Sequence, residues 1–312
     1  MRKAVFLDAA TLGPASLDPI RALCTLECYP TSAPQEALQR VEGCNILIIN
    51  KVKVTPELLD AAGEGLELVC EAATGVNNID LEACRQRGVE VRNVAGYSTT
   101  SVCQLCFTQI LALTCEVRRF DSWCKDGDYS RSGLFTEVSA PWSELSGKTL
   151  GIVGMGTIGK KMAAIGEAFG MEVVYFSTSG TSHCSDYPSL PLDELLRRSD
   201  VVSIHCPLNA RTAGLIGERE LGMMKPGALL VNAARGGIVD EAALSAAVGS
   251  GSIGGAAVDV FTTEPLPESN PLLHCSRPER LILSPHVAWA SNAALERLVR
   301  GIADNISGFF SD

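Results

Sequence analysis

Residues 150–159, with the sequence LGIVGMGTIG, combine an apolar stretch with the glycine pattern GxGxxG. We expect the apolar residues to form a buried strand and residues 160–165 to form a helix after the turn. In such a unit Gly154 makes the tight turn, Gly156 lets the backbone approach a pyrophosphate, and Gly159 lets the helix pack on the strand. The helix N-terminus then presents unpaired N–H groups to the anion. The alternative is a purely structural glycine turn, but the flanking strand and helix favour a dinucleotide-binding unit.

Strands and helices are expected to alternate along the whole chain, which is the pattern of parallel sheets with crossover helices. Before residue 96 the expected strands are 4–7, 46–49, 67–70 and 89–91, and the expected helices are 16–23, 34–41, 56–62 and 81–88. A long helix is expected over 99–119, where glycine and proline are absent, and a last helix over 290–310. Six further strands are expected at 150–153, 173–176, 201–205, 228–231, 256–260 and 281–283. The sequence therefore predicts an α/β fold with two doubly wound, parallel-sheet domains.

Charge and hydropathy exclude several classes of partner. The formal net charge is −10, and no run of Lys or Arg exceeds two residues, which argues against nucleic acid and anionic membranes as partners. The first apolar run stops at Asp8, so it is interpreted as a strand rather than a signal peptide. No stretch approaches the roughly 18 apolar residues of a membrane span. We expect a soluble, cytoplasmic protein.

Twelve cysteines are many for a chain of 312 residues. A zinc site would need two close pairs, or a pair with histidines at ligand spacing, and the histidines at 183, 205, 274 and 286 are scattered. A large chain with a full core does not need a disulfide framework. We interpret the cysteines as small buried hydrophobic residues, for example Cys103 and Cys106 on one helix face, and expect no metal.

Three side chains that follow expected strands can carry chemistry, because ligands of open α/β sheets lie beyond the carboxyl ends of the strands. Arg235 follows the strand at 228–231 and could clamp a carboxylate, although a surface salt bridge is the alternative. Glu264 follows the strand at 256–260, and His286 follows the strand at 281–283. Alone, Glu264 or His286 would be interpreted as a surface or packing residue. Together these two residues form a proton-transfer unit, because a carboxylate orients a histidine and stabilises its imidazolium form.

In this order Arg235, Glu264 and His286, with the glycine turn, resemble the D-isomer-specific 2-hydroxyacid dehydrogenase family over nearly the whole chain. The resemblance implies a Rossmann cofactor domain, residues 97–288, nested in a flavodoxin-like substrate domain, residues 1–96 plus 289–312. It also implies a homodimer built largely from the cofactor domains. By position, Arg235 would bind and polarise a 2-oxo acid, His286 would be the acid/base, and Glu264 would be its partner.

The resemblance also implies the residues that hold each ligand. Those expected at the cofactor are Gly154, Met155, Gly156, Thr157, Ile158, Gly159, Ser177, Cys206, Pro207, Thr212, Ala233, Ala234 and Asp259, the last of which would bind the nicotinamide amide. Those expected at the substrate are Lys51, Thr74, Gly75, Val76, Arg235 and Trp289. Thr74, Gly75 and Val76 would offer backbone N–H groups to the substrate carboxylate, and a plain strand-to-helix turn is the alternative there.

The cofactor preference depends on the residue type at the end of the second strand of the dinucleotide-binding unit. An acidic residue there usually binds the adenosine ribose, but this chain has Ser177 instead. The charge that would repel a 2′-phosphate is therefore absent, yet the next basic residues along the chain are Arg197 and Arg198. The sequence slightly favours NAD(H) and leaves NADP(H) open.

The substrate is less constrained. Tyr97–Ser101, Asn50-Lys51 and Trp289 resemble the glycerate dehydrogenase/hydroxypyruvate reductase branch of the family. Lys51 or Asn50 could meet a 3-hydroxyl group, and a solvated lysine at a strand end is the alternative. The function expected is NAD(P)-dependent reduction of a small, hydroxypyruvate- or glyoxylate-like 2-oxo acid to the D-2-hydroxy acid. Two alternatives stay open: a dehydrogenase for larger branched or aryl 2-oxo acids, and a dinucleotide-sensing, corepressor-like binding protein.

Overall fold

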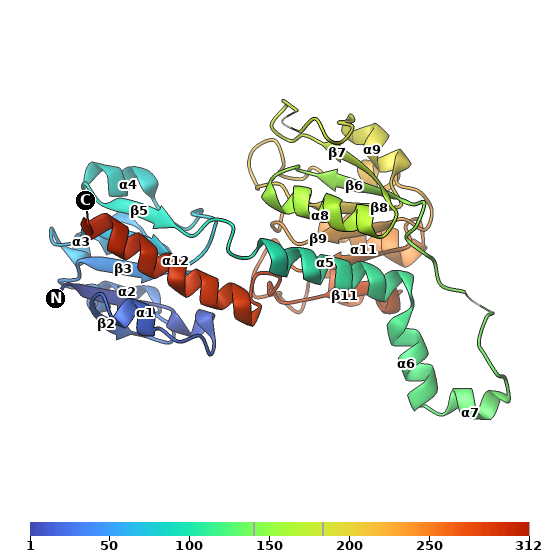
Figure 1. Ribbon diagram of the computed structural model, residues 1–312, viewed down its shortest axis with the longest axis horizontal. Coiled ribbons are helices and arrows are strands. Elements are labelled where there is room, and N and C mark those ends of the chain that lie inside the picture. The colour runs from blue at the N-terminus through green and yellow to red at the C-terminus, as the bar shows by residue number, and fades with distance from the viewer. Residues whose placement is uncertain (140, 183, 312) are drawn as a thin grey trace. The chain divides into compact units, whose positions relative to one another are not determined.

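The computed structural model describes residues 1–139, 141–182 and 184–311. The chain divides into two compact units, drawn in Figure 1. Unit 1 comprises Met1–Ser98 and Trp289–Asp312, and unit 2 comprises Thr99–Ala288. Each unit holds one wholly parallel sheet, which confirms the predicted α/β fold class.

The sheet of unit 1 has the strand order β2-β1-β3-β4-β5, the flavodoxin-like order. Its strands are β1 (Lys3–Phe6), β2 (Thr25–Cys28), β3 (Ile46–Ile49), β4 (Leu68–Glu71) and β5 (Glu90–Asn93). The central strands β3 and β4 are buried at every position, as strands covered by helices on both faces must be. The carboxyl ends of β3 and β4 therefore open side by side at one edge of the sheet.

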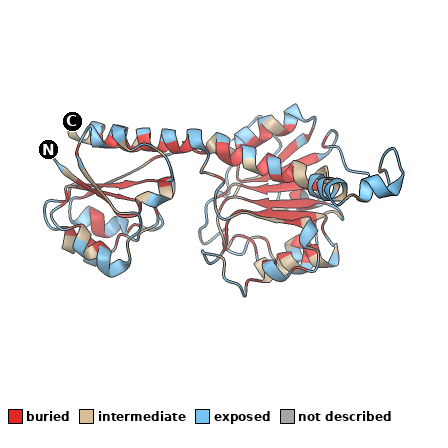
Figure 2. Ribbon diagram, turned by 90° about the horizontal axis from the view of Figure 1, so that it is seen from below, coloured by how far each residue is buried: buried red, intermediate tan, exposed pale blue. Residues whose placement is uncertain are grey.

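Helices cover both faces of this sheet (Figure 2). They are α1 (Asp18–Arg21), α2 (Pro34–Arg40), α3 (Pro56–Ala62), α4 (Leu81–Gln86) and α12 (Asn292–Ser311), with a 3-10 turn at Ala9–Leu12. Side chains of α1 and α12 form one core layer, and side chains of α2, α3 and α4 form the other. Local sequence fixes where such helices begin: the Thr55 hydroxyl accepts from the N–H of Leu58, and Pro56 occupies the first turn of α3.

The sheet of unit 2 has the order β11-β10-β9-β8-β6-β7. Its strands are β6 (Thr149–Val153), β7 (Glu172–Phe176), β8 (Val201–Ile204), β9 (Leu229–Asn232), β10 (Gly255–Val258) and β11 (Leu281–Leu283). The strand order reverses between β6 and β8, which is where a doubly wound sheet binds its ligand. Beyond β7, a single parallel bridge from Tyr175 to Ser189 stands where a further strand would pair.

Two helix layers enclose this sheet (Figure 2). The helices are α5 (Thr99–Thr114), α6 (Val117–Lys125), α7 (Asp128–Ser132), α8 (Thr157–Ala168), α9 (Leu192–Arg198), α10 (Glu218–Leu221) and α11 (Glu241–Ser250), with 3-10 turns at Pro271–His274 and Pro278–Arg280. α5 and α8 pack on one face, and α9, α10 and α11 pack on the other. α6 and α7 extend away from the sheet as an arm (Figure 1).

Two expectations about the elements were wrong. The short edge strand β2 was not predicted, because the alternation of polar and apolar residues in its sequence Thr-Leu-Glu-Cys spans only four residues. The helix expected over 99–119 ends at Thr114, because Glu116 takes a left-handed backbone conformation with φ of 53° and starts α6 in a new direction. None of the described helices is by itself long and apolar enough to cross a membrane; α5 and α6 pass that test only as a pair bent by 60°.

Candidate functional site

The glycine turn lies between β6 and α8. Gly154 has φ of 99°, and a Cβ added there would lie 2.9 Å from the backbone nitrogen of Cys206. A Cβ on Gly159 would collide with the carbonyl oxygen of Gly154. A Cβ on Gly156, in contrast, would meet no atom within 4 Å. Gly154 and Gly159 are therefore required by the fold, whereas Gly156 borders open space of the kind that a pyrophosphate needs.

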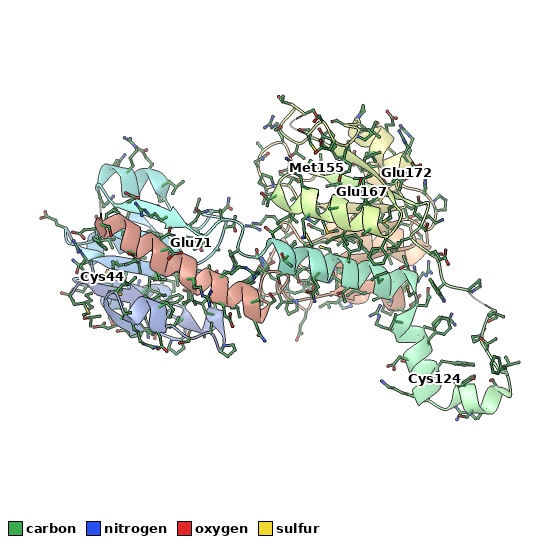
Figure 3. All side chains as sticks on the ribbon, viewed as in Figure 1. Cys44, Glu71, Cys124, Met155, Glu167 and Glu172 are labelled. Atoms are coloured by element: carbon green, nitrogen blue, oxygen red, sulfur yellow. The ribbon has the colours of Figure 1, made fainter. Side chains whose placement is uncertain are left out.

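The other residues expected at the cofactor follow strands of the same sheet. They are Ser177 after β7, Cys206, Pro207 and Thr212 after β8, Ala233 and Ala234 after β9, and Asp259 after β10, with Met155, Thr157 and Ile158 in the glycine turn and first turn of α8. Figure 3 labels Met155 between β6 and α8. The buried Thr212 hydroxyl shapes the loop after β8 by donating to the carbonyl of Pro207 at 2.6 Å. The fold thus brings the whole set to the carboxyl edge of one sheet, as a bound dinucleotide requires.

The sequence interpretation missed Arg211. This residue lies in the loop after β8, and its Nη1 donates to the carbonyl of Ser179 at 2.9 Å, in the turn that follows β7. The adjacent Gly180 lies close enough that an added Cβ would be 3.7 Å from the same nitrogen. A basic side chain therefore does reach the turn that begins at Ser177, from a loop too distant in sequence for local spacing to reveal it.

His286 and Glu264 meet within unit 2. His286 Nδ1 lies 2.7 Å from Glu264 Oε2, and Glu264 Oε1 accepts from the backbone N–H of Phe261 at 2.9 Å. Both side chains keep partial contact with solvent, at 23% exposure for His286 and 35% for Glu264. When Nδ1 carries the proton toward the carboxylate, Nε2 is the ring nitrogen that can exchange a proton with a ligand. Glu264, fixed at both oxygens, orients the imidazole for that exchange.

Asp259 positions the loop that carries His286. This carboxylate is fully buried and accepts from the Ser284 hydroxyl at 2.5 Å and from the N–H groups of Val287 and Ala288 at 3.0 and 2.9 Å. Burial raises the pKa of Asp259, and these hydrogen bonds act against that rise. The expected contact of Asp259 with a nicotinamide amide stays a prediction; its observed geometry holds the loop from 284 to 288.

The remaining described histidines are poorly suited to proton transfer, and His183 lies outside the described residues. Burial lowers the pKa of His205 to about 4, and its Nε2 lies 2.8 Å from the Ser203 hydroxyl in the sheet. His274 sits on the surface, with Nε2 2.9 Å from the carbonyl of Glu268. Of the three histidines in the described part of the chain, His286 alone pairs with a carboxylate at the carboxyl edge of the sheet.

Arg235 follows β9 and is half-buried. Its Nη1 donates to the carbonyl of Ala234 at 2.7 Å, and the Asn232 side chain holds the loop by donating to the carbonyl of Arg235 at 3.1 Å. No carboxylate of the described residues forms an ion pair with Arg235. The guanidinium therefore keeps donors for an anionic ligand, because a surface salt bridge does not occupy it.

In unit 1, Thr74, Gly75 and Val76 follow β4. Their backbone N–H groups donate to no residue that the structure describes. Two hydrogen bonds with the end of β5 and the residue after it fix the turn. Asn93 Nδ2 donates to the carbonyl of Thr74 at 2.6 Å, and the Thr74 hydroxyl donates to the carbonyl of Val94 at 3.1 Å. Consecutive unpaired N–H groups in a rigid turn suit a carboxylate.

Lys51 and Trp289 also lie together in unit 1. Lys51 Nζ is 5.8 Å from the centre of the Trp289 ring, which meets the Tyr97 ring edge-on at 6.4 Å. Two side chains clamp the segment that carries Lys51. Asp8 accepts from its backbone N–H at 2.5 Å, and Asn78 Nδ2 donates to the carbonyl of Val52 at 3.1 Å.

Glu71, at the end of β4, was not singled out from the sequence. Its side chain is fully buried, Oε2 accepts from Asn78 Nδ2 at 2.9 Å, and Oε1 has no hydrogen-bond partner among the described residues. Burial, with a smaller contribution from the charge of Asp8, raises the pKa of Glu71 to about 8. Figure 3 labels Glu71 in unit 1. No sequence pattern distinguishes it from an exposed glutamate at the end of a strand.

The chain is similar to known proteins over nearly all its length. Residues 107–288 match the family model described as "D-isomer specific 2-hydroxyacid dehydrogenase, NAD binding domain". A glycerate dehydrogenase of Methylorubrum extorquens is 35% identical over 308 residues, which cover 99% of this chain and 96% of that protein. A glyoxylate reductase of Korarchaeum cryptofilum is 34% identical over 291 residues, which cover 91% and 86%.

Two solved structures show the same architecture with cofactors bound. A D-lactate dehydrogenase from Aquifex aeolicus, complexed with NAD and lactic acid, has a TM-score of 0.83 and 28% identity, covering 99% of this chain and 95% of that one. An acyclic imino acid reductase in complex with NADPH and D-Arg has a TM-score of 0.87 and 27% identity, covering 99% and 97%. The two relatives hold different nicotinamide dinucleotides on this fold.

Proposed function

The chain belongs to the D-isomer specific 2-hydroxyacid dehydrogenase family, and on that premise we propose that it reduces a small 2-oxo acid of the hydroxypyruvate or glyoxylate type to the D-2-hydroxy acid. As a member it is an oxidoreductase that acts on CH–OH groups with a nicotinamide dinucleotide. The observation that carries the proposal is the contact between His286 Nδ1 and Glu264 Oε2 at 2.7 Å, beyond the carboxyl ends of β10 and β11. Names of the relatives above support the substrate class.

The bound dinucleotide supplies the hydride that the carbonyl carbon receives. His286 gives its Nε2 proton to the carbonyl oxygen, and Glu264 stabilises the ring in the correct orientation while it is charged. Arg235 donates to the same oxygen and stabilises the negative charge that develops on it. In the reverse direction His286 accepts the hydroxyl proton. Glu264 and His286 need fixed positions for these roles: the Phe261 N–H donates to Glu264, and Asp259 accepts from the N–H of Val287 beside His286.

We propose that groups of unit 1 select the acid. The N–H groups of residues 74–76 would bind the substrate carboxylate, and Lys51 would meet a polar substituent at C3 of the acid. The Lys51 ammonium lies against an aromatic face, so a hydroxyl group suits it better than an alkyl chain. This favours hydroxypyruvate over branched or aryl 2-oxo acids.

Initial rates test the proposal. NADH and NADPH would be oxidised in parallel with hydroxypyruvate, glyoxylate, pyruvate and one branched or aryl 2-oxo acid. We expect the highest kcat/KM with hydroxypyruvate or glyoxylate. Replacing His286→Ala should lower kcat by about 10²–10⁴-fold, the usual contribution of a general acid, with the dissociation constant of the dinucleotide unchanged.

The surface histidine offers a matched control, because His274→Ala removes an imidazole from the same unit without touching the carboxyl edge. Equal losses in both variants would remove His286 from the chemistry. Activity mainly on the larger acids would contradict the role of Lys51. Tight dinucleotide binding without turnover on any acid would favour the dinucleotide-sensing alternative.

We propose further that the protein is a homodimer that uses the arm of unit 2. The arm and the segment that follows α7 carry exposed large apolar side chains, which are Val117, Tyr129, Leu134, Phe135, Val138 and Trp142. Phe135 is 95% exposed, and α6 buries none of its side chains. Such apolar surface on one projection suits a second copy of the chain. Light scattering should show a dimer for the wild type and a monomer for Phe135→Ser/Trp142→Ser; a monomeric wild type would refute this.

A further inference from the structure

We infer that Arg211, together with Ser177 and Ser179, forms a binding site for the 2′-phosphate of NADP(H). The inference rests on the proposed function only in taking the glycine turn as the dinucleotide site. A dinucleotide that lies along this turn places its adenosine ribose at the end of β7, because the second strand of such a unit ends there. The turn that begins at Ser177 is therefore where a 2′-phosphate would lie.

The turn from 177 to 182 has the sequence Ser-Thr-Ser-Gly-Thr-Ser and contains no carboxylate. The hydroxyls of Ser177 and Ser179 lie 3.0 Å apart and both donate to the carbonyl of Thr181, at 2.6 and 3.0 Å. The backbone N–H groups of Thr178 and Ser179 donate to none of the residues that the structure describes. The turn thus uses its two hydroxyl hydrogens internally and keeps two unpaired amide donors.

Arg211 adds the cation. The loop after β8 fixes its backbone, since the N–H of Arg211 donates to Asn209 Oδ1 at 2.9 Å and the Thr212 hydroxyl closes the same loop. Its guanidinium reaches the carbonyl of Ser179, and no carboxylate in the described part of the chain forms an ion pair with it. One N–H of the guanidinium is used there, and the others remain for an anion.

The alternative is that Arg211 serves only to close the turn. A single hydrogen bond from an exposed arginine to a carbonyl contributes little to stability, and a neutral donor would serve as well. A permanent cation beside a turn with unpaired amide donors and no carboxylate is instead what a phosphate dianion requires. Ser177 in place of an acidic residue leaves the preference between NAD(H) and NADP(H) open. The turn after β7 then forms one half of the phosphate site, and Arg211 from the loop after β8 forms the other half.

Ligand binding without any substrate tests this. The dissociation constants of NADPH and NADH would be measured with the full chain by nicotinamide fluorescence, and those of 2′,5′-ADP and 5′-AMP by calorimetry. We expect the wild type to bind NADPH and 2′,5′-ADP more tightly than their partners without the phosphate. Arg211→Gln should weaken binding of the phosphorylated ligands by roughly 10–100-fold and leave NADH and 5′-AMP unchanged.

Two further variants sharpen the result. Ser177→Asp places a carboxylate at the ribose and should abolish the preference for the phosphate while NADH still binds. Arg277→Gln removes a half-buried arginine just before β11, at the opposite edge of the same sheet, and should change none of the constants. Equal affinity of the wild type for both ligands of each pair, an unchanged ratio in Arg211→Gln, or no nucleotide binding at all would overturn the inference. A preference for the phosphate without turnover on any 2-oxo acid would refute the proposed reaction alone.

Discussion

Replacing Glu71→Gln should change how the stability of the protein depends on pH. The Glu71 carboxyl is 0% exposed, and one of its oxygens has no hydrogen-bond partner among the described residues. Water cannot stabilise its charged form there, so burial raises its pKa from 4.5 to about 8. Asn78 and Lys51 favour the charged form but do not reverse the effect.

The sign is set by where each state holds the proton. Between pH 4.5 and 8 the folded chain keeps the proton on Glu71, whereas the unfolded chain has released it. The free energy of unfolding therefore falls as the pH rises through this window and levels off above it. About 1.4 kcal/mol for each pH unit amounts to about 5 kcal/mol over the whole window, which is an upper bound for this one group. A neutral glutamine removes this dependence and still accepts the hydrogen bond from Asn78.

Calorimetric melting from pH 5 to pH 9 measures the effect. Wild type and Glu71→Gln should melt at similar temperatures at pH 5, and the variant should be the more stable by roughly 10 °C at pH 9, since each kcal/mol shifts the melting of a domain of this size by a few degrees. Glu64→Gln, which removes an exposed carboxyl just before β4, should run parallel to the wild type. A constant difference between wild type and Glu71→Gln across the range would show that the carboxyl is charged in the fold, and would refute the reasoning.

Further predictions concern unit 2. Glu264→Gln keeps a hydrogen-bond acceptor beside His286 but removes the charge, so kcat should fall by about 10²-fold or more while the dissociation constant of the dinucleotide, measured by fluorescence, stays unchanged. Gly236→Ala should lower the melting temperature strongly or prevent folding, because its Cβ would enter the backbone carbonyl of Phe261. Gly156→Ala should keep the wild-type melting temperature, since its Cβ meets no atom within 4 Å, but should weaken dinucleotide binding about tenfold or more. Dinucleotide binding as tight as in the wild type would show that the pyrophosphate does not pass this glycine.

The sequence was sufficient for those features that depend on local pattern. Continuous apolar runs such as Ile46–Ile49 predict buried parallel strands, and the structure has a strand at that position. The fold class could be predicted from the alternation of strands and helices, and the sheet order then places residues after each strand at one edge. That rule is why Arg235, Glu264 and His286 could be singled out without knowledge of the contact between Glu264 and His286.

The features that the sequence could not reveal depend on contacts between distant segments. Arg211 reaches the turn after β7 from the loop after β8, and no spacing along the chain relates the two. Glu71 differs from any other glutamate only through its burial between the two helix layers of unit 1. The end of α5 depends on the backbone of Glu116, a residue whose type does not by itself favour a left-handed conformation.

The backbone of His286 shows how the fold restricts its side chain. His286 has φ of 52°, in the left-handed region that costs a residue with a Cβ about 1–2 kcal/mol. Asp259 holds the residue there, because its backbone carbonyl accepts from the N–H of His286 at 2.7 Å and its carboxylate accepts from the next two N–H groups. Glu264 then fixes the ring through Nδ1. Asp259 thus sets the backbone, and Glu264 sets the imidazole. The strained backbone of His286 and the burial of Asp259 both cost free energy. That the fold keeps them indicates that the site requires a fixed orientation of the ring.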